Sequence, residues 1–352
     1  MGLTPRQRVL TTFAHERPDR VPRWCGASEE FWAKAKRELA LDDEALRVRV
    51  GDDFRRVYAQ YAGPSFPLRH ADATCRTIFG VERTGLGYGQ PLEHPLAGAT
   101  IRQVHDYPWP EPAWMDVAKI RDYALSFGRQ YAILGGDWSP FWHDAIDLLG
   151  MENLYMKMYD EPELVDAVMG QMVDYYAAVS ERIFAAASDA IDIFFIGNDL
   201  GSQTGPLLGP GLFERFVLPH LRRLIDLGHA YGLKVQMHCC GGFRPLIPAL
   251  IDAGLDALHA VQPCCAGMDL RALKADFGRR IVFNGAIDSH HVLIDGTPES
   301  VRRDVRKVLE IMMPGGGYVA GASHDTILEE TPTENVLAMF DAVGEFGLYQ
   351  AG

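Results

Sequence analysis

The chain has 352 residues, of which 47% are hydrophobic and 23% are charged, as in an ordinary globular protein rather than a disordered one. The net charge is −13 at pH 7 and Lys and Arg are not clustered, which argues against nucleic acid as a partner. Because there is neither a run of 18 apolar residues nor an N-terminal apolar segment of signal-peptide length, we expect a cytoplasmic protein with no membrane partner.

The first third of the chain predicts two helices, a short strand and a long irregular segment. Thr4 and Pro5 are typical of a helix start, residues 21–26 of a short strand, and residues 28 to about 46 of a second helix. Seven prolines then interrupt residues 52–115. We interpret this range as an insertion with short strands, either a plain surface excursion or a lid that lines a pocket.

The rest of the chain alternates regularly between apolar strands and helices. Strands are predicted at residues 131–138, 191–199, 234–240, 257–262, 281–285 and 317–322. Helices are predicted at residues 151–158, 162–187, 210–231, 245–253, 270–277, 298–312 and 333–346.

With residues 21–26 and one further strand near residues 77–81, the count reaches eight strands. Strands that are apolar throughout indicate a parallel sheet covered by helices. We therefore predict a single domain, 1–352, with an α/β fold. Its type is a (β/α)₈ TIM barrel, in preference to an open sheet, with an N-terminal helical extension and an elaborated early loop region.

Titratable and sulfur-bearing residues gather where the predicted strands end, and barrels of this type carry their active sites at that end. One strand runs into His238-Cys239-Cys240 followed by two glycines. Successive strand side chains point to opposite faces, so His238 and Cys240 share a face while Cys239 points away. Imidazole and thiolate are zinc ligands, although buried cysteines also serve as small hydrophobic residues. The six cysteines, two adjacent pairs among them, do not indicate a disulfide framework.

The sequence resembles the uroporphyrinogen decarboxylase superfamily over nearly its whole length. The matching segments are residues 3–9 with 17–22, 107–110, 198–203, His238 with 244–247, 284–288, and 314–318 with 323–325. The resemblance implies a (β/α)₈ barrel, as the strand pattern does. The true decarboxylases carry an Arg-Gln-Ala-Gly-Arg element near the first strand that meets the carboxylates of their substrate. Residues 23–28 contain a single arginine, so decarboxylation of uroporphyrinogen itself is not expected.

Residues 238–241 are similar to the His-x-Cys-Gly motif of the cobalamin-linked methyltransferases in this superfamily, which hold zinc with that motif and a further cysteine. The loop after the last strand, where the further cysteine would lie, reads Gly-Ala-Ser-His-Asp over residues 321–325. The resemblance therefore implies zinc on His238 and Cys240, with His324 as the first choice for third ligand. The alternatives for that ligand are Asp325, Cys264 and Cys265.

Other side chains at the strand ends are candidates for catalysis or substrate binding. Asp199 and Asp288 are candidates for accepting a proton or orienting a substrate, the alternative being that each caps a loop or helix. An indole face attracts cations, so tryptophans at this end are candidates for lining a pocket, although packing at the barrel rim is an equal alternative. The candidate substrate-binding residues are Trp24, Trp138, Trp142, Gln203 and Asn284. His143 is interpreted as an ordinary rim residue.

Three functional hypotheses follow. The first is a zinc-dependent methyltransferase that moves a methyl group between a small molecule and a corrinoid (cobalamin), free or on a partner protein. The second is a metal-free decarboxylase of a small carboxylated substrate in which Asp199 and Asp288 manage a proton. The third is a non-catalytic protein that binds a small molecule or corrinoid. The oligomeric state is left open, a homodimer included.

Overall fold

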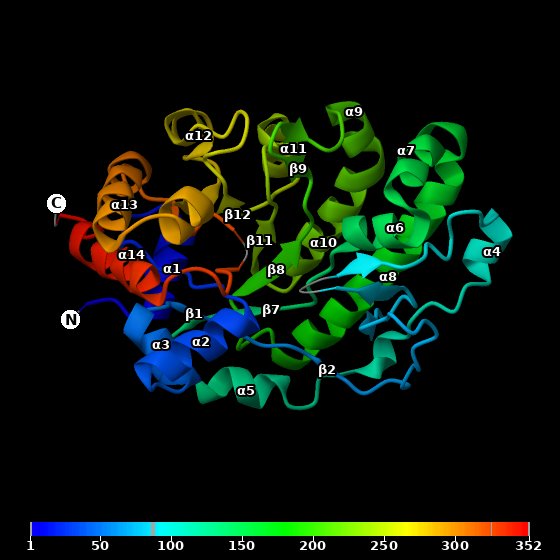
Figure 1. The fold of residues 1–352 in the computed structure, drawn as a ribbon, viewed down its shortest axis with the longest axis horizontal. Coiled ribbons are helices and arrows are strands. Elements are labelled where there is room, and N and C mark those ends of the chain that lie inside the picture. Colours follow the sequence, from blue (N-terminus) through cyan, green and yellow to red (C-terminus); the bar gives the residue numbers. More distant parts are fainter. Residues whose placement is uncertain (1, 86–88, 325, 351–352) are drawn as a thin grey trace.

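Seven parallel strands form the central sheet of the computed structural model, which describes residues 2–85, 89–324 and 326–350 (Figure 1). The strands lie in the order β1-β7-β8-β11-β12-β13-β14, so the order of the strands in the sheet is the same as their order along the chain. They are β1 (Phe54–Arg56), β7 (Ala132–Gly135), β8 (Ile193–Gly197), β11 (Lys234–His238), β12 (Ala257–Val261), β13 (Val282–Ile287) and β14 (Tyr318–Ala322). The six predicted strands from residue 131 onward are therefore confirmed.

The backbone of residues 22–24 lies between the first and last strands of this sheet and connects them. Ala320 N donates to Pro22 O at 2.8 Å and Trp24 N donates to Ala320 O at 2.9 Å, while Asp53 N donates to Arg23 O at 3.0 Å on the other side. The predicted strand at residues 21–26 is thus reduced to a single bridge. Pro22 has no backbone N–H and cannot extend the ladder. The α/β barrel fold is confirmed, with seven regular strands and this bridge as its eighth position.

The prediction of a barrel strand near residues 77–81 is wrong. These residues form a turn, in which Thr77 N donates to Val81 O at 2.8 Å, between two short antiparallel strands outside the barrel. The barrel strand is β1, whose sequence Phe-Arg-Arg does not look apolar. Arg55 makes this strand look polar in the sequence. It is nevertheless buried in the structure, because its guanidinium pairs with the carboxylate of Glu44, which neutralises its charge.

Helices cover the outside of the barrel, and the predicted helices from residue 151 onward are present (Figure 1). The α-helices are α1 (Pro5–Phe13), α2 (Glu29–Leu39), α3 (Asp43–Val50), α4 (Ile101–His105), α5 (Ile120–Ser126), α6 (Phe141–Leu149), α7 (Met151–Asp160), α8 (Pro162–Ala187), α9 (Pro210–Leu212), α10 (Leu218–Ala230), α11 (Ile247–Asp252), α12 (Leu270–Phe277), α13 (Pro298–Met312) and α14 (Thr333–Phe346). Short 3₁₀ or π turns are η1 (Pro112–Trp114), η2 (Phe213–Val217), η3 (Arg244–Leu246) and η4 (Ser289–Ile294). None of the helices in the described ranges is long and apolar enough to cross a membrane.

The first third differs from the prediction at one helix, whereas its irregular range contains short strands as expected. The helix predicted from residue 28 is divided, because Ala40 adopts φ +52° at the end of α2 and Asp42 caps a new helix, α3. The irregular range after β1 contains two small antiparallel sheets. They are β2 (Gln60–Tyr61) with β6 (Met115–Asp116), and β3 (Cys75–Arg76) with β4 (Glu82–Thr84) and β5 (Gln90–Pro91). A further pair, β9 (Gly201–Ser202) with β10 (Gly205–Pro206), follows β8.

The inside of the barrel is filled by a separate apolar cluster, to which α1 contributes. Val9 and Phe13 of α1 pack with inward side chains of the strands, including Phe54, Ile193 and Val282. Burial of large apolar side chains of this kind stabilises the fold by roughly 1.5–3 kcal/mol for each one. Since α1 contacts β7 and β14 and its apolar face fills the barrel from one end, the polar strand ends are left at the other.

Candidate metal centre

Three side chains from neighbouring strand ends approach one another closely at the carboxyl end of the barrel. The ligand atoms of Asp199, His238 and Cys240 all lie within 4.8 Å of one another. His238 Nε2 is 3.1 Å from Cys240 Sγ and 3.3 Å from Asp199 Oδ1. The register of β8 and β11 places Gly197 beside His238, so the chain that continues from β8 brings Asp199 to the same point.

This group fits a zinc ion by its chemistry and by its spacing. Nitrogen, thiolate and carboxylate are all zinc ligands, and tetrahedral zinc with bonds of about 2.0–2.3 Å holds its ligand atoms about 3.3–3.8 Å apart. The observed separations of 3.1 and 3.3 Å are close to these values. Three protein ligands also leave one position open, as in catalytic zinc sites.

The backbone after β11 is shaped so that the two cysteines separate. Gly241 has φ +87°, and a Cβ atom there would lie 2.4 Å from the carbonyl carbon of Gly201, so a side chain is excluded on both grounds. Cys239 is fully buried on the opposite side of the strand, where its Sγ accepts the N–H of Leu200 at 3.3 Å. Cys240 alone of this pair faces the group of ligand atoms.

The electrostatics of the group depend on Asp199 and two histidines. Burial raises the pKa of Asp199, but hydrogen bonds and charge from His143 and His238 outweigh this and hold the pKa well below its usual range. His143 Nε2 lies 3.3 Å from Asp199 Oδ2, and the backbone N–H of Cys240 donates to Asp199 Oδ1 at 2.7 Å. Asp199 is therefore a carboxylate at neutral pH, with each oxygen held by a separate partner.

The predicted third ligand, His324, lies outside this group, and within the described residues Asp199 occupies the third place. His324 Nδ1 is 3.1 Å from Thr326 O, and its side chain lines a neighbouring cavity. Of the alternatives, Cys264 is exposed. Cys265 is buried, which raises its pKa to about 11. Asp325 falls outside the part of the chain that the structure describes.

Two of the three candidate tryptophans lie beside the centre. The Trp138 ring stacks on the His238 ring with centroids 5.7 Å apart and an angle of 29°. A Cβ atom on Gly197 would lie 2.0 Å from this indole, so glycine is required for Trp138 to reach the strand. Trp24 packs inside the barrel mouth against Phe195. Trp142 is fully buried on α6, with Tyr155 as its ring contact.

The other candidate residues lie in three different settings. Asp288 caps η4 by accepting the N–H groups of His290 and His291, each at 2.9 Å. Asn284 is fully buried in the barrel, and its amide faces Gln236 at 3.4 Å. Gln203 is exposed on the turn between β9 and β10. Asp288 therefore acts as a cap, which was the alternative to a catalytic role. Asn284 instead lies inside the barrel.

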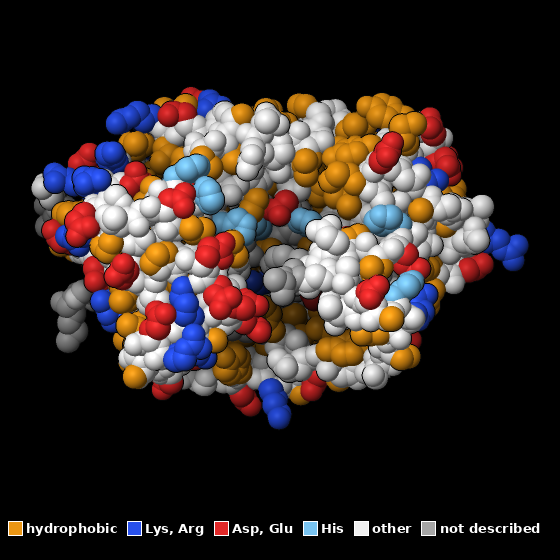
Figure 2. Space-filling model, viewed as in Figure 1, with side chains coloured by type: hydrophobic (Ala, Val, Ile, Leu, Met, Phe, Trp, Pro, Cys, Tyr) orange, Lys and Arg blue, Asp and Glu red, His pale blue; other side chains and the backbone are white. Residues whose placement is uncertain are grey.

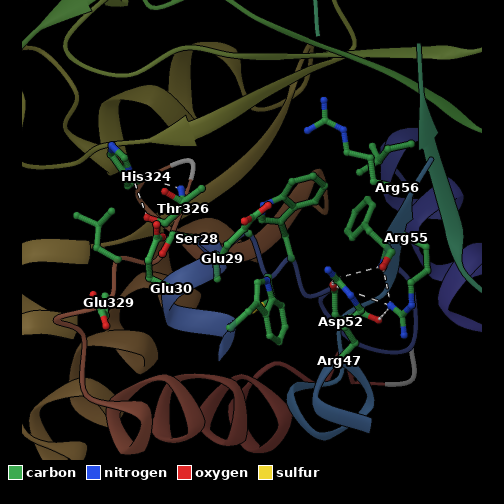
Figure 3. A pocket seen from close by; sticks show the side chains of 18 of the residues that line it. Ser28, Glu29, Glu30, Arg47, Asp52, Arg55, Arg56, His324, Thr326 and Glu329 are labelled. Carbon is green, nitrogen blue, oxygen red and sulfur yellow. Dashed lines mark hydrogen bonds and ion pairs between the residues drawn. The ribbon is translucent and has the colours of Figure 1, made fainter. Parts of the chain in front are cut away.

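A cavity of about 830 Å³ is lined by Trp24, Arg56 and His324 among others, but not by the three ligand residues themselves. The face of the molecule in Figure 2 is hollowed near its middle, with histidines along the upper edge. In Figure 3, His324, Glu30 and Glu329 lie on one side of this cavity and Arg56 on the other. Arg56 has no hydrogen bond or ion pair to any residue in the described ranges. Its guanidinium carbon lies 5.0 Å from the centre of the Trp138 ring and 4.9 Å from that of Phe195.

Three residues of this region were not selected from the sequence as site residues. Arg56 ends β1, a barrel strand that was predicted near residues 77–81 instead. His143 lies on α6, and only the tertiary structure brings this helix to the site. His259 lies in the middle of β12, whose residues are all buried, and burial lowers its pKa well below the usual value. A histidine within an apolar strand, as at residue 259, is the one sequence signal that marks any of them.

Comparison with known proteins gives two kinds of relative. Residues 115–346 match the family described as Uroporphyrinogen decarboxylase (URO-D). A uroporphyrinogen decarboxylase of Methylococcus capsulatus is 27% identical over 271 residues, 74% of this chain and 73% of that one. A methylcobamide:CoM methyltransferase of Methanosarcina acetivorans is 20% identical over 320 residues, 81% of this chain and 88% of that one.

The same fold occurs in a solved structure. A methyltransferase from Methanosarcina mazei superposes with a TM-score of 0.67 at 19% identity, and the match covers 98% of this chain and 99% of that one. The two chains therefore share the arrangement of strands and helices along almost their entire length.

Proposed function

The chain belongs to the uroporphyrinogen decarboxylase family, and from this premise we propose that it is a zinc-dependent methyltransferase. It moves a methyl group between a small molecule and a corrinoid, which is either free or carried on a partner protein. The observation that carries the proposal is the group of Asp199, His238 and Cys240, a nitrogen, sulfur and oxygen donor set with the spacing of a zinc site. The methyltransferase relatives support the same reaction class.

Zinc in this position lowers the pKa of a thiol that binds to it, so that the thiolate is available as a nucleophile. Each residue around the centre has a separate task. His238, Cys240 and Asp199 hold the ion. His143 holds the second oxygen of Asp199 at 3.3 Å, and Trp138 covers one face of the His238 ring and keeps water from it.

The direct test measures metal and methyl transfer on the purified protein. We expect about one zinc ion per chain, and transfer of the methyl group from methylcobalamin to a small thiol, followed by mass spectrometry of the thioether. Treatment with a chelator should stop the reaction and added zinc should restore it. Absence of stoichiometric zinc from the wild-type protein, or transfer that is indifferent to chelation, would remove the proposal.

The setting of Arg56 leads us to propose that the small substrate carries a negative charge. A guanidinium is the side chain best suited to hold a carboxylate, sulfonate or phosphate. The charge of Arg56 acts on the buried carboxyl of Asp137, but its guanidinium forms no hydrogen bond or ion pair with a described side chain and lines the cavity. Trp138 contacts both the Arg56 guanidinium and the His238 ring, so it spans the distance between the anion subsite and the proposed metal.

Replacing Arg56 with glutamine is expected to raise KM for 3-mercaptopropionate roughly 10- to 100-fold, because a hydrogen bond to a charged group contributes about 1.5–3 kcal/mol. KM for the neutral thiol 2-mercaptoethanol should stay unchanged, as should the zinc content. Arg56→Lys keeps the charge and should recover part of the loss. Equal effects on both thiols would contradict an anion subsite.

The second candidate function is decarboxylation of a small carboxylated substrate without metal. It is favoured by the relatives named uroporphyrinogen decarboxylase, one of which is 27% identical where the methyltransferase of Methanosarcina acetivorans is 20% identical. In this reaction Asp199 would accept or donate a proton while Arg56 holds the carboxylate. Carbon dioxide release that survives chelation would favour this candidate over methyl transfer.

A further inference from the structure

On the side of the His238 ring away from Cys240 lies a second buried histidine, His259. Strands β11 and β12 are parallel and pair His238 with His259 in register, so both side chains enter the barrel from neighbouring strands. The two Nδ1 atoms are 3.1 Å apart. The exposed fractions are 3% for His238 and 0% for His259, so water does not compete for this contact.

Two imidazole nitrogens at this distance form a hydrogen bond only when one carries a proton and the other has a free lone pair. His238 Nε2 faces Cys240 Sγ and Asp199 Oδ1, and a nitrogen that binds a metal must offer its lone pair. The proton of His238 is then on Nδ1 and is donated to His259. His259 must accept it on Nδ1 and carry its own proton on Nε2.

The ring of His259 is packed between two aromatic side chains, and its Nε2 atom lacks a hydrogen-bond partner among the described residues. The ring packs between Trp24, at a centroid distance of 5.0 Å, and Phe195, at 5.5 Å. His259 Nε2 is buried and has no hydrogen-bond partner in the described part of the chain. An unsatisfied buried polar group costs stability, so a residue that only filled the core would be better apolar.

We propose that His259 is a positioning residue that accepts a hydrogen bond from His238 and so fixes the tautomer and orientation with which His238 presents Nε2 to the metal. The inference rests on the proposed zinc function. Metal-binding histidines in general have their second nitrogen held by a carboxylate, a backbone carbonyl or water. In this chain a neutral histidine on the next strand takes that part.

The test compares two variants of equal size at residue 259. The amide oxygen of asparagine can accept a hydrogen bond near the position of Nδ1, whereas leucine cannot. We expect His259→Leu to weaken zinc binding roughly 10- to 100-fold in competition with a chromophoric chelator. His259→Asn should stay within a few-fold of wild type. Thermal unfolding of the metal-free proteins shows whether either variant has lost its fold.

A second measurement does not depend on a variant that folds. In zinc-loaded wild-type protein with nitrogen-15 histidine, we expect the His238 proton on Nδ1 and the His259 proton on Nε2. The opposite placement would overturn the inference, as would zinc affinities that are equal in the wild type and His259→Leu, or equally reduced in both variants. These failures leave a zinc protein in place. Wild-type protein that binds no zinc overturns the proposed function and, with it, this role for His259.

Discussion

Replacing Cys240 with serine is expected to weaken zinc binding by more than about 100-fold and to abolish methyl transfer. The reason is that a serine hydroxyl does not ionise at neutral pH and so cannot replace a thiolate as a ligand. Loss of a residue that only supports a ligand already costs about 10- to 100-fold in affinity, and Cys240 Sγ lies directly in the ligand group. Metal analysis after dialysis, together with the methylcobalamin assay, measures both effects.

The neighbouring cysteine is the matched control. Cys239→Ala removes a thiol one residue away, but Cys239 Sγ points to the opposite side of the strand and accepts the N–H of Leu200. Burial also raises the pKa of Cys239 well above the usual value, so this sulfur remains a thiol. The Cys239→Ala protein should keep its zinc. A Cys240→Ser protein with wild-type zinc content would show that the metal, if present, is bound elsewhere.

The second large effect is expected for Asp199→Asn, which keeps the size of the side chain and removes its charge. Zinc affinity should fall at least about 10-fold, because the carboxylate is the third member of the donor set and balances the charge of the ion. Methyl transfer should fall with it. The change also weakens the contacts to His143 and His238, which hold the pKa of Asp199 low in the wild type.

Asp288→Asn serves as the comparison and separates the two candidate functions. Asp288 caps η4 through the N–H groups of His290 and His291, and asparagine is an equally good cap, so the fold should be preserved. A zinc methyltransferase should show wild-type metal affinity and activity in this variant. If the reaction is a decarboxylation managed by two carboxylates, both Asp199→Asn and Asp288→Asn should lose activity while the metal content has no influence.

Most of the barrel could be predicted from the sequence because its strands are buried on both faces. Such strands are continuous apolar runs that need no tertiary information to be found, as for β7, β8 and β14. Prediction failed for β1, because two consecutive arginines are not typical of a buried strand. In the structure Arg55 is neutralised by Glu44, and Arg56 lines the cavity. It also failed to divide α2 from α3, where a left-handed Ala40 ends the helix without a glycine.

The sequence alone determined the part of the candidate site that lies at one strand end. Alternation along an extended chain predicts that His238 and Cys240 share a face. In the structure His238 ends β11, Cys240 lies two residues beyond it, and their Nε2 and Sγ atoms are 3.1 Å apart, so this pairing is a local property of the backbone. The partners of that pair come from other strands and helices: Asp199 after β8, His143 on α6 and His259 on β12. Which side chains meet across strands depends on register and strand order, which are properties of the closed barrel and not of any single segment.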